Sequence, residues 1–450
     1  MDITLTFPES VASTLLDGVP LPRVALVEYD QPTPAAVDDV PAAVRDELHR
    51  GGARNLLPPG GTVAIGVGSR GISRLRDIVT ALVGELSSWG LRPFIFPAMG
   101  SHGGATASGQ LEMLTHLGVT ESRVGAPIES QMDTAVVGRT PDGMPVHLDR
   151  RALAADAIVF VARIKPHTAF RGPYESGLAK MIAIGIGKQA GAAATHARGF
   201  GDMADMVPAM ARVAIERAPI RFGLGVIENA RDEVCRVVLV PADRVLDEEP
   251  PLLDQAREAM ARLPFEFIDV LVIDRIGKDI SGDGADPNIT GRYPTPYASG
   301  GPTVNKMVVL DLTEASGGNG TGIGIADFTT QRFARKLDLG RTYPNALTST
   351  VPGPVKLPMT LPGDRLALAA AVLTCNAVGR QPRLVRIADT LHLGSLWISE
   401  VMLGEAGEHP HLRLIEAPRS LDFDAAGNLR DLAGDMAVSG APGRQVVGPW

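Results

Sequence analysis

Hydrophobic runs that end in glycine-rich turns recur along the first half of the chain. Residues 62–67 form one such run, and apolar residues at helical spacing follow it over residues 73–89. The plan repeats with a strand ahead of residue 100 and a helix from about residue 105, and residues 155–164 form a third buried strand. Strands that alternate with helices predict an α/β fold with a mainly parallel, doubly wound sheet.

The length of the chain, 450 residues, predicts more than one domain. The pattern breaks near residues 263–267, which predicts an α/β domain over residues 1–265 and a second α/β domain over residues 266–450 that closes a cleft. The last 70 residues read as short strands and loops. Whether this tail packs back on the first domain stays open.

Three of the glycine-rich turns directly follow predicted strands and carry one chemically useful side chain each. Arg70 lies in GVGSRG, His102 in GSHGGAT and His167 in KPHTAFRG. The carboxyl ends of parallel strands meet at one edge of a sheet, where ligands of such folds bind. The three turns therefore predict an active site at that edge.

Two of these side chains have a structural reading beside the functional one. Arg70 either caps or pairs with a neighbour, or it forms a bidentate fork for a carboxylate or phosphate. His102 is either a structural loop residue or a catalytic one, because the glycines after it allow close approach of a ligand.

The densest chemistry lies in residues 163–200. The glycine-bearing segment 176–180 opens a helical pattern that could bind an anionic group at its N-terminus. No Walker spacing, GxGxxG fingerprint or HExxH zinc motif accompanies it. The residues alone predict an enzyme site for an anionic ligand. Solvated charge and phosphate contact remain equal alternatives for Lys165, Arg171 and Lys188.

Composition narrows the class of protein. The net charge of -8 argues against a nucleic-acid partner. The two cysteines, Cys235 and Cys375, lie in apolar runs, as buried reduced thiols do, and two thiols cannot form a thiolate metal cluster. The N-terminus lacks the pattern of a secretion signal, and the longest charge-free apolar run, about residues 366–378, is too short to span a bilayer. We therefore expect a cytoplasmic protein without a membrane partner.

Four short motifs together resemble a known family. They are G-x-H at residues 100–102, P-H at 166–167, S-G-x-x-K at 176–180, and His196, sixteen residues after Lys180. This combination resembles the nickel-dependent lactate racemase family, whose members use a nickel-pincer nucleotide, nickel pyridinium-3,5-bisthiocarboxylic acid mononucleotide. The set spans residues 102–196, and the two-domain length agrees with the family.

The resemblance implies a role for each matching residue. Lys180 would hold the cofactor covalently through a thioamide, and His196 would be the protein ligand of nickel. His102 and His167 would be the acid–base pair. The further residues implied or guessed are Ser176 and Gly177 for the cofactor, Arg70 for cofactor or substrate, and Arg292 for the substrate.

The implied reaction is the racemisation or 2-epimerisation of a 2-hydroxy acid. Removal of hydride from C2, while a histidine takes the hydroxyl proton, gives a 2-keto acid and avoids a carbanion. Return of hydride to either face inverts the carbon, and the cofactor carries the difficult step. The implied partners are a small 2-hydroxy acid and cofactor-synthesis proteins; the oligomeric state stays open.

Departures from the family pattern favour a substrate larger or more polar than lactate. Val67 stands where close relatives of the lactate enzyme have an acidic residue, and Gly103 stands where an arginine is usual. The loop from His167 to Ser176 is longer by about three residues and contains Arg171.

The alternatives to this function are a nickel-pincer-dependent epimerase or redox enzyme for a sugar-derived or other hydroxy substrate, and a non-catalytic protein that binds an anionic metabolite.

Overall fold

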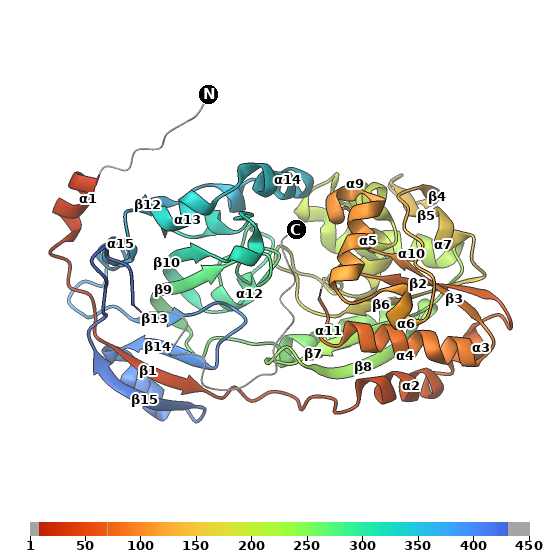
Figure 1. Cartoon of the computed structure of the whole chain (residues 1–450), viewed down its shortest axis with the longest axis horizontal. Helices are drawn as coiled ribbons and strands as arrows, with labels where there is room; N and C mark the ends of the chain where they lie inside the picture. The colour runs from red at the N-terminus through yellow and green to blue at the C-terminus, as the bar shows by residue number, and fades with distance from the viewer. Residues whose placement is uncertain (1–8, 70, 431–450) are drawn as a thin grey trace. The chain divides into compact units, whose positions relative to one another are not determined.

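A computed structural model describes residues 9–69 and 71–430 of the chain (Figure 1). The chain divides into two compact units. We call residues 33–260 the N-terminal unit, and residues 1–32 with 261–450 the C-terminal unit.

This division corrects the predicted assignment of residues 1–32 to the first domain. Strand β1 (Val24–Tyr29) pairs antiparallel with β14 (Ser395–Ser399) and with β15 (Leu412–Arg419), so the start of the chain belongs to the C-terminal unit. A pairing between distant ends of a chain leaves no local trace in its hydrophobic pattern. The second division, after Met260, lies just ahead of the break seen in the sequence.

The N-terminal unit is built on a five-stranded, mostly parallel sheet in the order β3-β2-β6-β7-β8. The first four strands run parallel to one another, and β8 is antiparallel to β7. Strands β4 and β5 form a separate antiparallel pair. The strands are β2 (Thr62–Val67), β3 (Arg92–Pro97), β4 (Thr134–Arg139), β5 (Pro145–Asp149), β6 (Ala157–Arg163), β7 (Ile220–Glu228) and β8 (Val234–Pro241).

Alternation along the strands decides which face of the sheet meets which helices. Val63, Ile65 and Val67 of β2 belong to one continuous core, together with Ile78 and Leu82 of a covering helix. The helices of this unit are α2 (Val40–Arg50), α3 (Ala53–Leu56), α4 (Leu75–Ser88), α5 (Ala107–His116), α6 (Glu121–Val124), α7 (Arg150–Leu153), α8 (Leu178–Lys180), α9 (Lys188–His196), α10 (Met203–Arg217) and α11 (Val245–Ala259).

One stretch of helix in this unit is irregular. A short α8 runs directly into a π-helical turn, Met181–Gly185, and α9 follows from Lys188. Leu178, Ile182 and Ile186 are fully buried along it. Single π-helical turns inside helices occur frequently at functional sites. Here the turn separates the proposed cofactor lysine from the helix that ends at the proposed nickel ligand.

The C-terminal unit holds an eight-stranded mixed sheet in the order β12-β11-β10-β9-β13-β14-β1-β15. Strands β12 to β13 in this order are parallel, and each later neighbour is antiparallel. Both units thus confirm the predicted α/β class. The strands not yet given are β9 (Phe267–Ile276), β10 (Thr303–Leu312), β11 (Phe328–Thr330), β12 (Met359–Leu361) and β13 (Leu384–Ile387).

The helices of the C-terminal unit surround a second core. Leu368 and Ala371 of one helix pack with Val270, Val308 and Trp397 of the sheet. Strand β11 passes directly into a helix after Thr330. The helices are α1 (Glu9–Leu16), α12 (Pro287–Thr290), α13 (Gln331–Lys336), α14 (Leu339–Ser349), α15 (Asp364–Thr374) and α16 (Leu403–Glu408). Across the described residues of both units, no helix has the length and apolarity needed to cross a bilayer.

Candidate active site

The three glycine-rich turns lie at one edge of the N-terminal unit. They follow β2, β3 and β6, which are adjacent and parallel in the order β3-β2-β6, so their carboxyl ends lie side by side. This is the arrangement that the turns predicted, and it is the usual place for a ligand in such sheets. Arg70, in the first turn, lies outside the described residues.

His102 connects the first two turns. Its Nδ1 is hydrogen-bonded to the hydroxyl of Ser69, the residue ahead of Arg70. The same turn is tied to the irregular helical stretch, because the N–H of Gly100 donates to the carbonyl of Gly185 at 3.2 Å. The His102 turn is therefore fixed both to its neighbouring turn and to the segment that carries Lys180 and His196.

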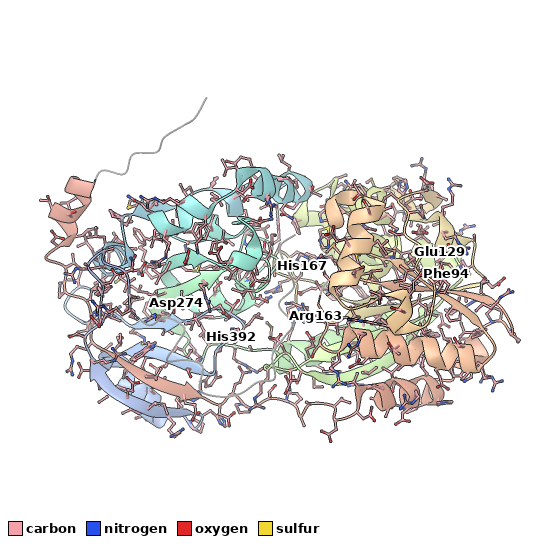
Figure 2. All side chains as sticks on the ribbon, viewed as in Figure 1. Phe94, Glu129, Arg163, His167, Asp274 and His392 are labelled. Carbon is pink, nitrogen blue, oxygen red and sulfur yellow. The ribbon has the colours of Figure 1, made fainter. Side chains whose placement is uncertain are left out.

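An ion pair joins the ends of β6 and β7. Arg163, the last residue of β6, donates to Glu228 Oε2 at 2.5 Å from the end of β7 (Figure 2 labels Arg163). The second carboxylate oxygen of Glu228 accepts from the N–H of Ser73 at 2.6 Å. Both side chains are mostly buried, so the pair joins two strand ends to the turn that follows β2.

His167 lies in the third turn, where a backbone N–H holds its ring and a side-chain carboxylate holds its main chain. The N–H of Ala169 donates to its Nδ1 at 3.0 Å, and its own N–H donates to Glu175 at 2.7 Å. The ring stacks in tilted geometry on Phe170, with centroids 4.5 Å apart, and lies 6.0 Å from the ring of Phe200 (Figure 2 labels His167).

His196, the last residue of α9, has the opposite ring environment. Its Nδ1 lies 2.8 Å from the carbonyl oxygen of Ala192, and since a carbonyl can only accept, the ring proton is on Nδ1. Burial lowers the pKa of His196; the Ala192 contact opposes this, and the positive charge of Lys180 adds to it. The ring is therefore neutral at pH 7, with the lone pair on Nε2, as a metal-ligating histidine requires.

The rings of Phe170 and Phe200 lie beside three candidate residues of the segment 163–200, namely His167, Lys180 and His196. The rings of Phe170 and Phe200 lie 6.3 Å apart. The ring of His196 meets Phe200 edge-on at 5.6 Å, His167 contacts both aromatic rings, and the ammonium of Lys180 lies 6.0 Å from the centroid of Phe170. Neither phenylalanine was expected at the site, because a lone aromatic in a glycine-rich segment does not reveal its neighbours.

The start of α8 already holds an anion from the protein itself. The fully buried carboxylate of Glu249, on α11, accepts from the N–H of Ala179 at 2.7 Å. A Cβ on Gly177 would lie 2.1 Å from its Oε1, so only glycine leaves room for it. The anion-binding start predicted for residues 176–180 is thus occupied by a side chain. Ser176 forms a backbone bridge with Lys165.

Lys188 is neither solvated nor exposed to a ligand, so both readings from sequence are wrong. Its side chain is fully buried; its ammonium donates to the carbonyl of Pro97 at 2.6 Å and to Gln110 Oε1 at 3.1 Å, and lies 3.2 Å from Asp149 Oδ2. The Gln110 amide in turn donates to the carbonyl of His102 at 3.2 Å. Lys188 therefore supports the His102 turn from beneath.

Arg292, guessed to bind the substrate, lies in the C-terminal unit and makes structural contacts. Its guanidinium donates to the carbonyls of Asn305 and Ile325, each at 3.1 Å, and forms an ion pair with Asp327 at 3.1 Å. These contacts join the loop after β9 to β10 and to the segment ahead of β11, so a structural role accounts for this residue.

The residues present fit the implied cofactor better than a cluster-type metal site. No group of three or more His, Cys, Asp or Glu that could hold a metal ion occurs within residues 9–69 and 71–430. A cofactor that brings most donors of the metal itself requires one protein ligand and one anchor. The Nε2 of His196 and the amine of Lys180, close enough for the lysine charge to shift the histidine pKa, match those two needs.

A family model matches the part of the chain that carries these motifs. Residues 20–206 match the lactate racemase N-terminal domain family. Among solved structures, the lactate racemase apoprotein from Thermoanaerobacterium thermosaccharolyticum is 14% identical, with a TM-score of 0.47 over 82% of this chain and 98% of that one. A structural-genomics protein from Thermotoga maritima is also 14% identical, with a TM-score of 0.42 over 63% of this chain and 72% of that one. No curated protein gives a significant match.

The matched range contains every residue that the four motifs contribute, from Gly100 to His196. It also contains the three adjacent turns and the aromatic pair. Residues 20–206 of the chain are therefore similar to the lactate racemase N-terminal domain family.

Proposed function

We propose that the protein is a racemase or 2-epimerase of a 2-hydroxy acid that uses a nickel-pincer nucleotide. The observation that carries the proposal is the pairing of Lys180 with His196 beside Phe170 and Phe200, where His196 is neutral and its lone pair lies on Nε2. The match of residues 20–206 to the lactate racemase N-terminal domain family supports the reaction class.

In this proposal two residues hold the cofactor. The amine of Lys180 is the covalent anchor, and Nε2 of His196 is the nickel ligand, its ring oriented by the Nδ1–H bond to Ala192. When bound, the cofactor supplies reversible uptake of hydride from the C2 carbon of the substrate. The protein contributes an oriented ligand, an anchor and two neighbouring aromatic rings.

The proton chemistry belongs to His102 and His167. A 2-hydroxy acid must lose its hydroxyl proton as the keto form appears and must regain it afterwards, and an imidazole does both near neutral pH. Both histidines lie on turns at the same sheet edge.

Intact mass and metal content test the proposal. Protein produced together with cofactor-synthesis proteins should carry a mass adduct and nickel, and should racemise or epimerise a 2-hydroxy acid with little uptake of deuterium from solvent. Lys180→Ala should lose the adduct, and His196→Ala should lose nickel. His102→Ala and His167→Ala should keep the adduct but lose about 100-fold or more in kcat.

The exposed His116, at the end of α5, supplies a matched control. His116→Ala should keep adduct, nickel and turnover. Absence of adduct and nickel in the parent protein under these conditions would overturn the proposal, and full activity of either His102→Ala or His167→Ala would overturn the acid–base assignment.

A further inference from the structure

Glu175 is a fully buried carboxylate at the centre of the His167 loop. Its Oε2 accepts the N–H of His167 at 2.7 Å, and its Oε1 accepts the N–H of Gly172 at 3.2 Å. Two guanidinium groups neutralise it: Arg257 of α11 at 2.6 Å and Arg171 at 3.3 Å. A buried carboxylate with this many donors is well compensated, and it fixes the donors in return.

The same network binds both backbone groups of His167, its N–H and its carbonyl. Arg171 donates to the carbonyl of His167 at 2.6 Å while Glu175 takes its N–H. Arg171 lies in the loop between His167 and Ser176. The loop therefore supplies an arginine that holds its own histidine.

With the loop fixed in this way, the N–H of Ala169 reaches Nδ1 of His167 at 3.0 Å. A backbone N–H can only donate, so Nδ1 must carry its lone pair, and the proton of the neutral ring is on Nε2. A proton on Nδ1 would break this contact and face another N–H. His167 and His196 therefore hold opposite tautomers, each set by one backbone group.

His102 is not restricted in the same way. Its Nδ1 partner is the hydroxyl of Ser69, which can donate or accept by rotating. This hydroxyl therefore does not fix the tautomer of His102, whereas the N–H of Ala169 fixes that of His167.

We propose that Glu175 is a positioning residue that holds His167 in its Nε2–H tautomer. This inference rests on the proposed function and extends it. His167 meets the reacting oxygen of the substrate as a hydrogen-bond donor. The hydroxyl proton passes to the ring nitrogen of His102, which becomes an imidazolium and gives the proton back to that oxygen when hydride returns to C2. The two histidines thus begin the reaction as one proton acceptor and one hydrogen-bond donor.

The first test is nitrogen NMR of the cofactor-free protein labelled with ¹⁵N-histidine. The His167 signals, assigned by their loss in His167→Gln, should show a protonated Nε2 and an unprotonated Nδ1 above pH 7. In Glu175→Gln the amide group would face Arg257 with its own donors, so the loop should relax and the signals should report a mixture of tautomers. Glu248→Gln, on α11 and paired only with the exposed Arg244, is the matched control and should leave them unchanged.

The second test uses the loaded enzyme. Glu175→Gln should keep adduct and nickel, lower kcat on the order of tenfold or more and change KM little, because the loop would present the wrong nitrogen. If Glu175→Gln does not fold, Arg257→Gln leaves the carboxylate in place, removes one guanidinium and should shift the same signals.

The outcomes separate this inference from the proposed function. A protonated Nδ1 on His167 in the parent protein would overturn the tautomer, and an unchanged tautomer in both variants would overturn the role of Glu175. The NMR measurement needs no cofactor and no turnover. It therefore stands even if the protein proves to catalyse another reaction.

Discussion

The His102 turn and the segment from His167 to Lys180 are held by buried groups of opposite charge. Beneath the His102 turn, the ammonium of Lys188 collects acceptors: the carbonyl of Pro97 directly, and the carbonyl of His102 through the side chain of Gln110. Beneath the other segment, the carboxylates of Glu175 and Glu249 collect donors, chiefly backbone N–H groups.

The contrast follows from what each piece of backbone leaves unpaired. A tight turn after a strand directs carbonyls inward, whereas a loop that starts a helix directs N–H groups inward. Each set needs a buried partner, because an unpaired buried polar group costs free energy. These buried charges differ in their countercharges. Lys188 forms an ion pair with Asp149, and Glu175 forms ion pairs with two arginines. Glu249 is buried without a countercharge, and burial raises its pKa to about 7.

The largest expected effect comes from removing the buried cation. Lys188→Met should lower the free energy of unfolding by about 3–5 kcal/mol, because it leaves the charge of Asp149 buried without a partner. Urea unfolding measures the loss. Asp149→Asn in the same chain should restore part of it, since the asparagine can still accept from the first N–H groups of α7. Arg244→Met, from an exposed pair, should change stability by no more than about 0.5 kcal/mol. A loss below about 1 kcal/mol for Lys188→Met would contradict the role given to this lysine.

The next effect distinguishes the uncompensated carboxylate by its pH dependence. The folded pKa of Glu249, about 7, is above its ordinary value of 4.5. Between these two values the folded protein keeps a proton that the unfolded chain has lost, so this group stabilises the fold fully below pH 4.5 and loses that contribution as pH rises to 7. Glu249→Gln mimics the protonated form. Its stability relative to the parent protein should rise by about 3 kcal/mol between pH 4.5 and 8.

Urea unfolding of both proteins over this pH range gives the difference, in which all other titrating groups cancel. A difference independent of pH would show that Glu249 titrates normally and that α8 begins on an ordinary carboxylate. The contrast with the compensated Glu175 would then disappear.

These buried partners mark the limit of what sequence patterns could predict. The turns with His102 and His167 were placed correctly because a strand and the glycine turn after it are adjacent in the chain. Lys188 was predicted to be either solvated or in contact with a phosphate, because its partner Asp149 lies at the end of β5, and nothing near α9 in the sequence points to the pairing. Sequence patterns likewise did not predict a role for Glu175, which directly precedes the S-G-x-x-K motif, because its partner Arg257 is distant in the sequence.

In the fold, too, local features were predicted from the sequence and contacts between distant segments were not. The alternation of strands and helices is local, and it predicted the α/β class. The membership of residues 1–32 depends on β1 meeting β14 and β15, which only the folded chain brings together. Convergence of Lys180 and His196 on the rings of Phe170 and Phe200 likewise depends on the π-helical turn between them, which apolar spacing did not reveal.

A smaller effect tests the space reserved for Glu249. Gly177→Ala should destabilise the protein by about 1–3 kcal/mol, because the new methyl group would overlap Glu249 Oε1. Glu249→Ala removes the obstacle, so the two substitutions together should cost less than their sum. Gly84→Ala, within α4 and with open space around its Cβ position, is the matched control and should be neutral or stabilising by up to about 1 kcal/mol. Urea unfolding of the four variants decides, and strict additivity would place the strain of Gly177→Ala elsewhere.

The smallest effect on stability comes from the half-exposed Arg257. Arg257→Met removes one of two guanidinium partners of Glu175, and with Arg171 and two N–H groups still in place the loss should be about 1 kcal/mol. The informative readout is local. Hydrogen exchange should accelerate over residues 165–176 and stay unchanged over residues 98–106, because Lys188 supports the second range without any contribution from Arg257. Acceleration of both ranges would mean that the two oppositely charged supports form one cooperative unit. His102 and His167 would then each depend on both Lys188 and Glu175. The opposite charges of Lys188 and Glu175 would reflect only which backbone groups lie nearest to each of them.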